Sequence, residues 1–163
     1  MPAKTKSLII VGVAAALASA VAVPAFTTAQ TSGGARRITV QEKVVDVVKD
    51  DLPPKSESKV SLGDRLITRQ SLFDANKKAL GTLYTDCSGV GPTKPLFDAT
   101  LECSATYRFN DGQVVTSGAT RLSRGEPIPV TGGTGAYAGA RGTVHTTQPA
   151  TGFDSADLIT IDA

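Results

Sequence analysis

The sequence is poor in the side chains that most often bind metal ions or carry out covalent catalysis. Its 163 residues include one histidine and two cysteines. Because His145 is the single histidine and Cys87 and Cys103 form no Cys-x-x-Cys motif, we expect no metal site. A lone histidine without a visible serine or cysteine partner is also weak evidence for a catalytic triad. We expect no organic cofactor either.

A large excess of one charge is also missing. The chain has 17 Lys and Arg against 15 Asp and Glu, and two of the lysines, Lys4 and Lys6, lie in its first residues. Without those two the charges balance, and no basic run remains to bind nucleic acid. A nearly neutral surface does not attract charged partners from a distance. The sequence therefore predicts an uncharged or weakly charged partner.

The first 25 residues have the order of a secretory signal peptide. Basic residues come first, a small and apolar run from Leu8 to Val23 follows, and small residues precede a cleavage site after Ala25 or, at the latest, Ala29. A retained membrane anchor is the alternative, although a run of about 16 residues is shorter than the roughly 20 that span a bilayer. We expect cleavage, a secreted protein and no stable insertion in the membrane.

Export would leave one domain of ordinary size. Residues 26–37 are small and polar and predict a flexible lead-in, and residues 38–163 suffice for a single core. In an oxidising compartment Cys87 and Cys103 should form a disulfide, which would stabilise the fold by about 3 kcal/mol. A reactive thiol is the alternative.

Alternation of apolar and polar residues predicts an all-β domain. It is clearest where Ala99, Leu101, Cys103, Ala105, Tyr107 and Phe109 alternate with polar residues, ahead of an Asp-Gly turn. The first strand should contain an irregularity near Glu42 and Lys43. We expect strands at 38–48, 65–73, 80–88, 99–109, 113–122, 128–130, 141–147 and 156–161. Eight antiparallel strands indicate a sandwich or a closed barrel, and closure removes exposed edges better.

A glycine-rich stretch superficially matches a dinucleotide-binding turn. Gly133, Gly135 and Ala138 fit its loose form, but a strand rather than a helix should follow, and too few residues remain for a nucleotide-binding half. We therefore expect the glycines to permit turns, bulges and close crossings of the backbone. The set is Gly132, Gly133, Gly135, Gly139 and Gly142.

Several short motifs resemble the allene oxide cyclase/dirigent barrel superfamily, in particular its small exported bacterial members. They are Gly63-Asp64, Ser71-Leu72-Phe73-Asp74, Leu80-Gly81-Thr82, Asp86-Cys87-Ser88, the distinctive run 130–137 (VTGGTGAY) and Ala140-Arg141-Gly142. The resemblance covers Ile38 to Ile161 and implies an eight-stranded antiparallel β-barrel around an apolar interior. Plant cyclases of this superfamily fold a fatty-acid epoxide into a ring, and dirigent members steer the coupling of phenoxy radicals.

Such a barrel would act as an isomerase or cyclase chiefly by orienting an apolar small molecule. No catalytic residue of the plant cyclases aligns with this chain. Relatives often form trimers, so a homo-oligomer, trimer or dimer, is expected from the resemblance.

The candidate ligand-binding residues share the apolar face of one predicted strand: Leu101, Ala105, Tyr107 and Phe109. Tyr107 could orient a ligand with its hydroxyl, but a core tyrosine bonded to a backbone carbonyl is favoured. Arg69 shares a face with Ile67 and Phe73, although a solvated arginine is favoured over one that enters the interior.

Three further polar residues are catalytic candidates. Arg141 could bind an anionic head group, but bonds to carbonyls of its turn are favoured. His145 should share a face with Arg141, opposite Val144. Glu102 falls on the polar face of its strand and would become a general acid or base only if a bulge reversed the faces.

Three functions remain open: a cyclase or isomerase, a non-catalytic carrier of a small molecule, and a filled barrel that contacts a protein. An inward carboxylate or arginine with a shifted pKa beside an open cavity would favour the enzyme. An interior lined by Leu, Val and Phe alone would favour the carrier.

Overall fold

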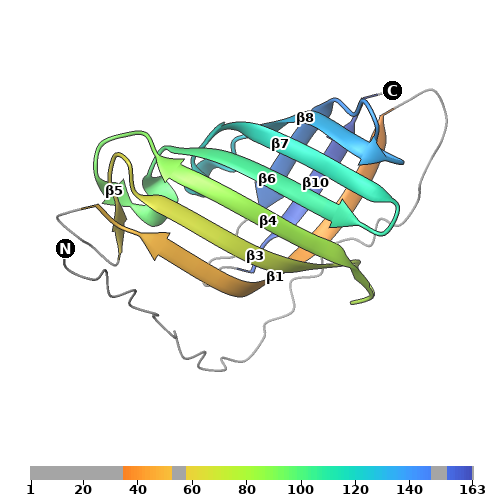
Figure 1. Ribbon diagram of the computed structural model, residues 1–163, viewed down its shortest axis with the longest axis horizontal. Helices are drawn as coiled ribbons and strands as arrows, with labels where there is room; N and C mark the ends of the chain where they lie inside the picture. The colour runs from red at the N-terminus through yellow and green to blue at the C-terminus, as the bar shows by residue number, and fades with distance from the viewer. Residues whose placement is uncertain (1–34, 53–57, 148–153, 163) are drawn as a thin grey trace, which may run out of the picture.

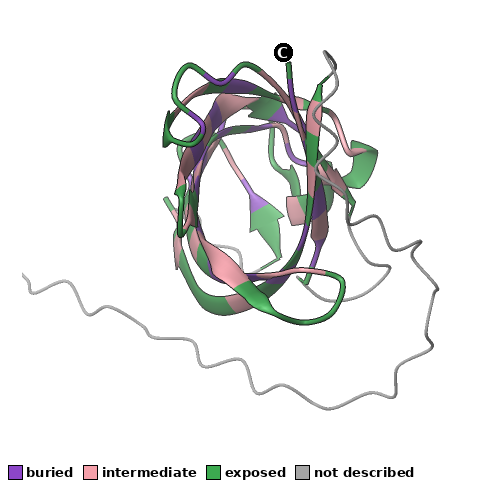
Figure 2. Cartoon of the chain, turned by 90° about the vertical axis from the view of Figure 1, so that its right-hand side faces the viewer, coloured by how far each residue is buried: buried purple, intermediate pink, exposed green. Residues whose placement is uncertain are grey.

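Eight long antiparallel strands close into one barrel in the computed structural model, which describes residues 35–52, 58–147 and 154–162. The order around the ring is β1-β10-β9-β8-β7-β6-β4-β3, and β3 pairs with β1 (Figures 1 and 2). The strands are β1 (Arg36–Asp50), β3 (Arg65–Phe73), β4 (Ala79–Gly89), β6 (Leu101–Phe109), β7 (Gly112–Thr120), β8 (Ile128–Gly135), β9 (Gly142–Thr147) and β10 (Ala156–Ile161). The predicted fold class is confirmed.

The alternation along β6 explains how the barrel separates core from surface. Leu101, Cys103, Ala105 and Tyr107 are buried, whereas Glu102 and the residues in phase with it face outward. Successive side chains of a strand point to opposite faces, so this sequence can pair with β4 and β7 and bury one face only. The predicted hairpin is also present, since Phe109 pairs with Gly112 across the Asn110-Asp111 turn.

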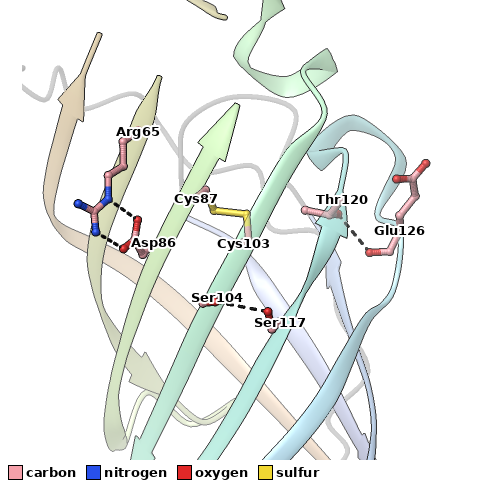
Figure 3. The surroundings of a disulfide bond; sticks show 8 residues. All are labelled: Arg65, Asp86, Cys87, Cys103, Ser104, Ser117, Thr120 and Glu126. Atoms are coloured by element: carbon pink, nitrogen blue, oxygen red, sulfur yellow. Dashed lines mark hydrogen bonds and ion pairs between the residues drawn. A yellow bond between two sulfur atoms is a disulfide. The ribbon is translucent and has the colours of Figure 1, made fainter. Parts of the chain in front are cut away.

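A second, smaller core lies at the end of the barrel where β4 ends and β6 begins (Figure 1). Here β2 (Lys59–Val60) pairs with β5 (Lys94–Pro95), next to the short 3₁₀ helices η1 (Leu96–Asp98) and η2 (Leu122–Arg124). Its buried members are Val60, Cys87, Ala99, Leu101 and Cys103. Cys87 and Cys103 sit directly opposite each other on β4 and β6 and form the predicted disulfide (Figure 3).

Two expected strand boundaries and the position of one irregularity were wrong. β1 begins at Arg36, two residues before the predicted start of the strand. Its irregularity lies between Val44 and Asp46 rather than at Glu42 and Lys43, and Glu42 therefore keeps its inward position. β8 continues through the glycines to Gly135, because their backbones still pair with β7.

The predicted signal peptide at residues 1–25 and the lead-in up to residue 34 lie outside the described residues. Within the described part of the chain, the search for a helix long and apolar enough to cross a bilayer finds none.

Two positions show why the glycine stretch needs glycine. A Cβ on Gly133 would lie 2.4 Å from the carbonyl oxygen of Tyr137 and 2.5 Å from that of Gln113. Gly142 has a φ of +140°, and its Cβ would lie 1.9 Å from the carbonyl oxygen of Thr160. Close backbone crossing and positive φ are both present, in agreement with a structural role for these glycines.

Candidate functional site

A cluster of five polar side chains lies inside the barrel. Glu42 comes from β1, Gln70 from β3, Tyr107 from β6 and Asp157 from β10, and Ser155 immediately precedes β10. All five are buried, and the exposed fractions of Glu42 and Asp157 are only 5% and 2%. Each side chain occupies the inward phase of its strand, so closing the ring brings together residues far apart in the sequence.

Hydrogen bonds form two groups in the cluster, one around Asp157 and one around Glu42. The Tyr107 hydroxyl donates to Asp157 Oδ2, and the Ser155 hydroxyl donates to Glu42 Oε2. Gln70 Nε2 also donates to Glu42 Oε2, at 3.3 Å. The two remaining oxygens, Glu42 Oε1 and Asp157 Oδ1, are buried and receive no hydrogen bond from another described residue. Buried carboxyl oxygens are costly to leave unpaired, which makes these two the chemically notable atoms of the site.

Burial raises the pKa of Glu42 well above its ordinary value, and a hydrogen bond to Asp157 and the charge of Asp157 raise it further. The donors Ser155 and Gln70 act in the opposite direction but do not prevail. Because Oε2 already accepts two hydrogen bonds, a proton held by Glu42 belongs on Oε1, where it can bridge to Asp157.

The pKa of Tyr107 is also raised well above its ordinary value, by burial and by the nearby carboxyls of Asp157 and Glu42. The phenol therefore remains a hydrogen-bond donor throughout the neutral range. Its role is to hold one oxygen of Asp157 in place.

The interior differs on the two sides of Tyr107. On one side the Tyr107 and Phe109 rings stack with centroids 6.5 Å apart, and Phe109 contacts the Tyr137 ring at 5.4 Å. On the other side Thr68 and Thr85 occupy inward positions of β3 and β4 yet remain partly exposed. The aromatic side is thus packed through ring contacts, and the other side presents threonine side chains toward the interior.

Four of the residues singled out from the sequence lie away from this cluster. Arg69 is solvated, as favoured, and donates to Asp46 on the outer face. Glu102 and His145 are exposed, so the reversal of faces that would have made Glu102 an internal acid does not occur. Arg141 donates to the carbonyls of Thr131 and Ala140 and so fastens its turn.

Tyr107 and the apolar candidates do face inward. Ala105 and Phe109 belong to the main core with Tyr107, whereas Leu101 belongs to the second core around the disulfide. The alternative that Tyr107 bonds a backbone carbonyl is wrong, because its partner is the Asp157 carboxylate.

Glu42, Gln70 and Asp157 were missed as site residues. The sequence did contain a clue, because each of these residues lies two positions from an apolar residue that faces the interior. Val40 precedes Glu42 in this way, and Ile159 follows Asp157. Within the described ranges, no three His, Cys, Asp or Glu side chains are grouped closely enough to hold a metal ion.

Solved structures share this barrel at low sequence identity. Pyocyanin demethylase is 21% identical with a TM-score of 0.66, and the match covers 77% of this chain and 98% of that one. A pterocarpan synthase dirigent protein is 15% identical, with a TM-score of 0.63 and coverage of 78% and 90%. A Diels-Alderase from Streptomyces koyangensis is 16% identical, with a TM-score of 0.57 and coverage of 81% and 71%. These likenesses establish the fold.

A search of the curated proteins gives no match. The model of the allene oxide cyclase barrel-like domain, in contrast, matches residues 37–155, well over half of the chain. Together with the closed eight-stranded barrel, this match shows that the chain belongs to the allene oxide cyclase barrel-like family.

Proposed function

We propose that this protein is an exported barrel that binds a largely apolar small molecule in its interior and orients it for cyclisation or stereoselective coupling. The observation that carries the proposal is the buried Glu42–Asp157 pair, tied to Tyr107 inside a barrel of this family. A carrier has no need for two coupled acids in its core, because burying them costs stability. Structural neighbours that are named as a demethylase and a Diels-Alderase support a catalytic use of such a barrel.

Orientation is the first contribution that the barrel can make. A flexible substrate held in one conformation has already lost the entropy that its reaction would otherwise cost, which can lower a barrier substantially. The packed aromatic side formed by Tyr107, Phe109 and Tyr137 offers a rigid apolar wall for this purpose.

Proton donation is the second contribution. Glu42 retains its proton to higher pH than an exposed glutamate, so it can serve as a general acid at neutral pH. Asp157 lies beside it as the acceptor that fixes that proton, and Tyr107 fixes Asp157. A ligand oxygen or nitrogen that reached Glu42 Oε1 would receive a hydrogen bond there and then, in the reaction, the proton.

The experiment has two stages. The protein is isolated from its native source, native mass spectrometry detects any small molecule that co-purifies, and that compound is incubated with the wild type, Glu42→Gln and the outward-facing control Glu102→Gln. General acid catalysis commonly raises a reaction rate 10²- to 10⁴-fold. We therefore expect the turnover rate to fall by at least about 100-fold in Glu42→Gln and to stay unchanged in Glu102→Gln.

Other results would change the assignment. A bound compound that the wild type leaves unchanged would make the protein a carrier. If no compound co-purifies and the neutral probe 1-methylnaphthalene does not bind either, the proposal is wrong, and a filled barrel that contacts other proteins takes its place. A dimer or trimer in the same spectra would support the proposed homo-oligomer.

A further inference from the structure

We propose that the interior site selects ligands carrying a protonated amine or a similar cationic N–H group and rejects ligands carrying a carboxylate. The inference rests on the proposed interior binding and specifies its chemistry. It follows from the unpaired oxygens of Glu42 and Asp157, from the charge that this pair retains, and from the placement of the basic side chains.

The first step concerns hydrogen bonds. Glu42 Oε2 and Asp157 Oδ2 already have donors, whereas Glu42 Oε1 and Asp157 Oδ1 have none among the other described residues. A single proton on Glu42 can bridge these two atoms but leaves further lone pairs unused. The site therefore keeps unused acceptor lone pairs, which favour a ligand that donates.

The second step concerns charge. With a proton retained by Glu42, the pair still carries the charge of Asp157 that raises the Glu42 pKa. None of the causes of the raised pKa of Glu42 or Tyr107 is a nearby cation. The groups that face the pair are Tyr107 from β6, Gln70 from β3 and Ser155, all of them uncharged at neutral pH.

Several basic side chains in the described part of the chain have partners away from the pair. Arg36 lies over the Tyr137 ring, with 4.6 Å from its guanidinium carbon to the ring centroid. Arg65 and Arg69 form ion pairs with Asp86 and Asp46 on the outer face, the first of which is drawn in Figure 3. The remaining ones bind near chain turns: Lys49 with Asp51 and the carbonyl of Lys59, Arg121 and Arg124 with Glu126, and Arg141 with carbonyls.

The third step compares ligands. A protonated amine beside the pair would neutralise its charge, and one of its N–H groups could donate to Asp157 Oδ1. A carboxylate in the same place would put a third acidic group against two others, and repulsion between charges a few ångströms apart is strong where water is excluded. An uncharged apolar ligand should lie between these two extremes.

The test uses two naphthalene probes that differ only in their head groups, 1-naphthylmethylamine as the cation and 1-naphthaleneacetate as the anion. Fluorescence titration at pH 7 gives both dissociation constants, and 1-methylnaphthalene serves as the neutral reference. We expect the amine to bind at least tenfold more tightly than the carboxylate, equivalent to about 1.4 kcal/mol. In Glu42→Gln/Asp157→Asn this preference should fall to less than threefold.

Controls separate the interior from the surface. Glu102→Gln removes an acid from the outer face and should leave the preference unchanged. The single isosteric variants Glu42→Gln and Asp157→Asn, with folding checked by circular dichroism, provide the comparison if the double variant does not fold, and each should reduce the preference.

Equal binding of the two probes, tighter binding of the carboxylate, or an equal effect of Glu102→Gln would overturn the inference. In each of these cases binding of 1-methylnaphthalene would leave the proposed function standing. If none of the three probes binds, both the inference and the proposed function fail.

Discussion

Tyr107 and Asp157 are hydrogen-bonded across the full width of the barrel. They lie on β6 and β10, which are separated by three strands in either direction around the ring. This side-chain bond therefore joins opposite walls directly, whereas the backbone hydrogen bonds join only neighbouring strands. It also places a polar group at the centre of an otherwise largely apolar core.

Replacing Tyr107 with phenylalanine should destabilise the fold by about 1.5–3 kcal/mol, because a buried hydrogen bond to a carboxylate is lost and Asp157 has no other described donor for Oδ2. The free energy of unfolding, measured by urea denaturation, tests this. Tyr84→Phe removes a hydroxyl from a half-exposed ring on β4 and should change the stability by no more than about 0.5 kcal/mol. Equal stability of Tyr107→Phe and the wild type would show that the bond contributes nothing.

Glu42 should make the stability fall as the pH rises. Its pKa in the folded state lies above the ordinary value of 4.5, so the folded protein holds the proton more tightly than the unfolded chain does. The favourable contribution is complete below pH 4.5 and is lost as the pH rises through the folded-state pKa, with a limiting slope of about 1.4 kcal/mol per pH unit. Glu42→Gln cannot titrate and should lose this slope.

Urea denaturation of the wild type, Glu42→Gln and Glu102→Gln across pH 5–9 would reveal the difference. The stability of Glu42→Gln relative to the wild type should increase with pH, and Glu102→Gln should follow the wild type. Parallel curves for all three proteins would mean that burial does not raise the pKa of Glu42.

The strands could be predicted from the sequence because the alternation of side chains is a local property. β6 shows this best, since its buried and exposed residues follow the expected pattern one by one. The disulfide could be predicted because the chain has two cysteines and a sequence that indicates export to an oxidising compartment, and the structure places them opposite each other on β4 and β6. The extension of β8 through its glycines was missed, because intrinsic propensity gives little indication that neighbours will pair with such a segment.

The site could not be assembled from the sequence because its parts meet only when the barrel closes. Tyr107 was expected to face inward, but its partner Asp157 is 50 residues away, and Ser155 is 113 residues from Glu42. The phase of Glu42 depended on where β1 bulges, and an irregularity expected at residues 42–43 hid its inward direction. A polar residue in the buried phase of a strand was the usable clue.

Loss of the disulfide should lower stability without changing the fold. Cys87 and Cys103 are separated by 16 positions, and a loop of this size corresponds to about 3 kcal/mol of stabilisation. The double variant Cys87→Ala/Cys103→Ala should therefore unfold at lower urea concentration and melt roughly 10 °C lower. A reducing agent should destabilise the wild type by a comparable amount and leave the double variant unaffected. If the reducing agent had no effect on the wild type, the two thiols would not be bonded in solution.

Gly142 and Gly132 lie in the same glycine stretch, but their replacement with alanine should change the stability of the protein by very different amounts. At Gly142 the new Cβ would lie 1.9 Å from the Thr160 carbonyl oxygen, and its φ of +140° is unfavourable for alanine, so Gly142→Ala should cost about 3 kcal/mol or more. At Gly132 the nearest heavy atom to the Cβ is Arg141 Nη1, at 4.0 Å, so Gly132→Ala should change stability by less than about 1 kcal/mol. Urea denaturation of the two variants would compare them directly.

Similar losses of stability in the two variants would mean that the motif is needed for something other than backbone geometry, such as contact with a ligand or a second chain. A loss confined to Gly142→Ala would tie the requirement to the close approach of the paired strands β9 and β10 at this position, where the backbones leave no room for a side chain.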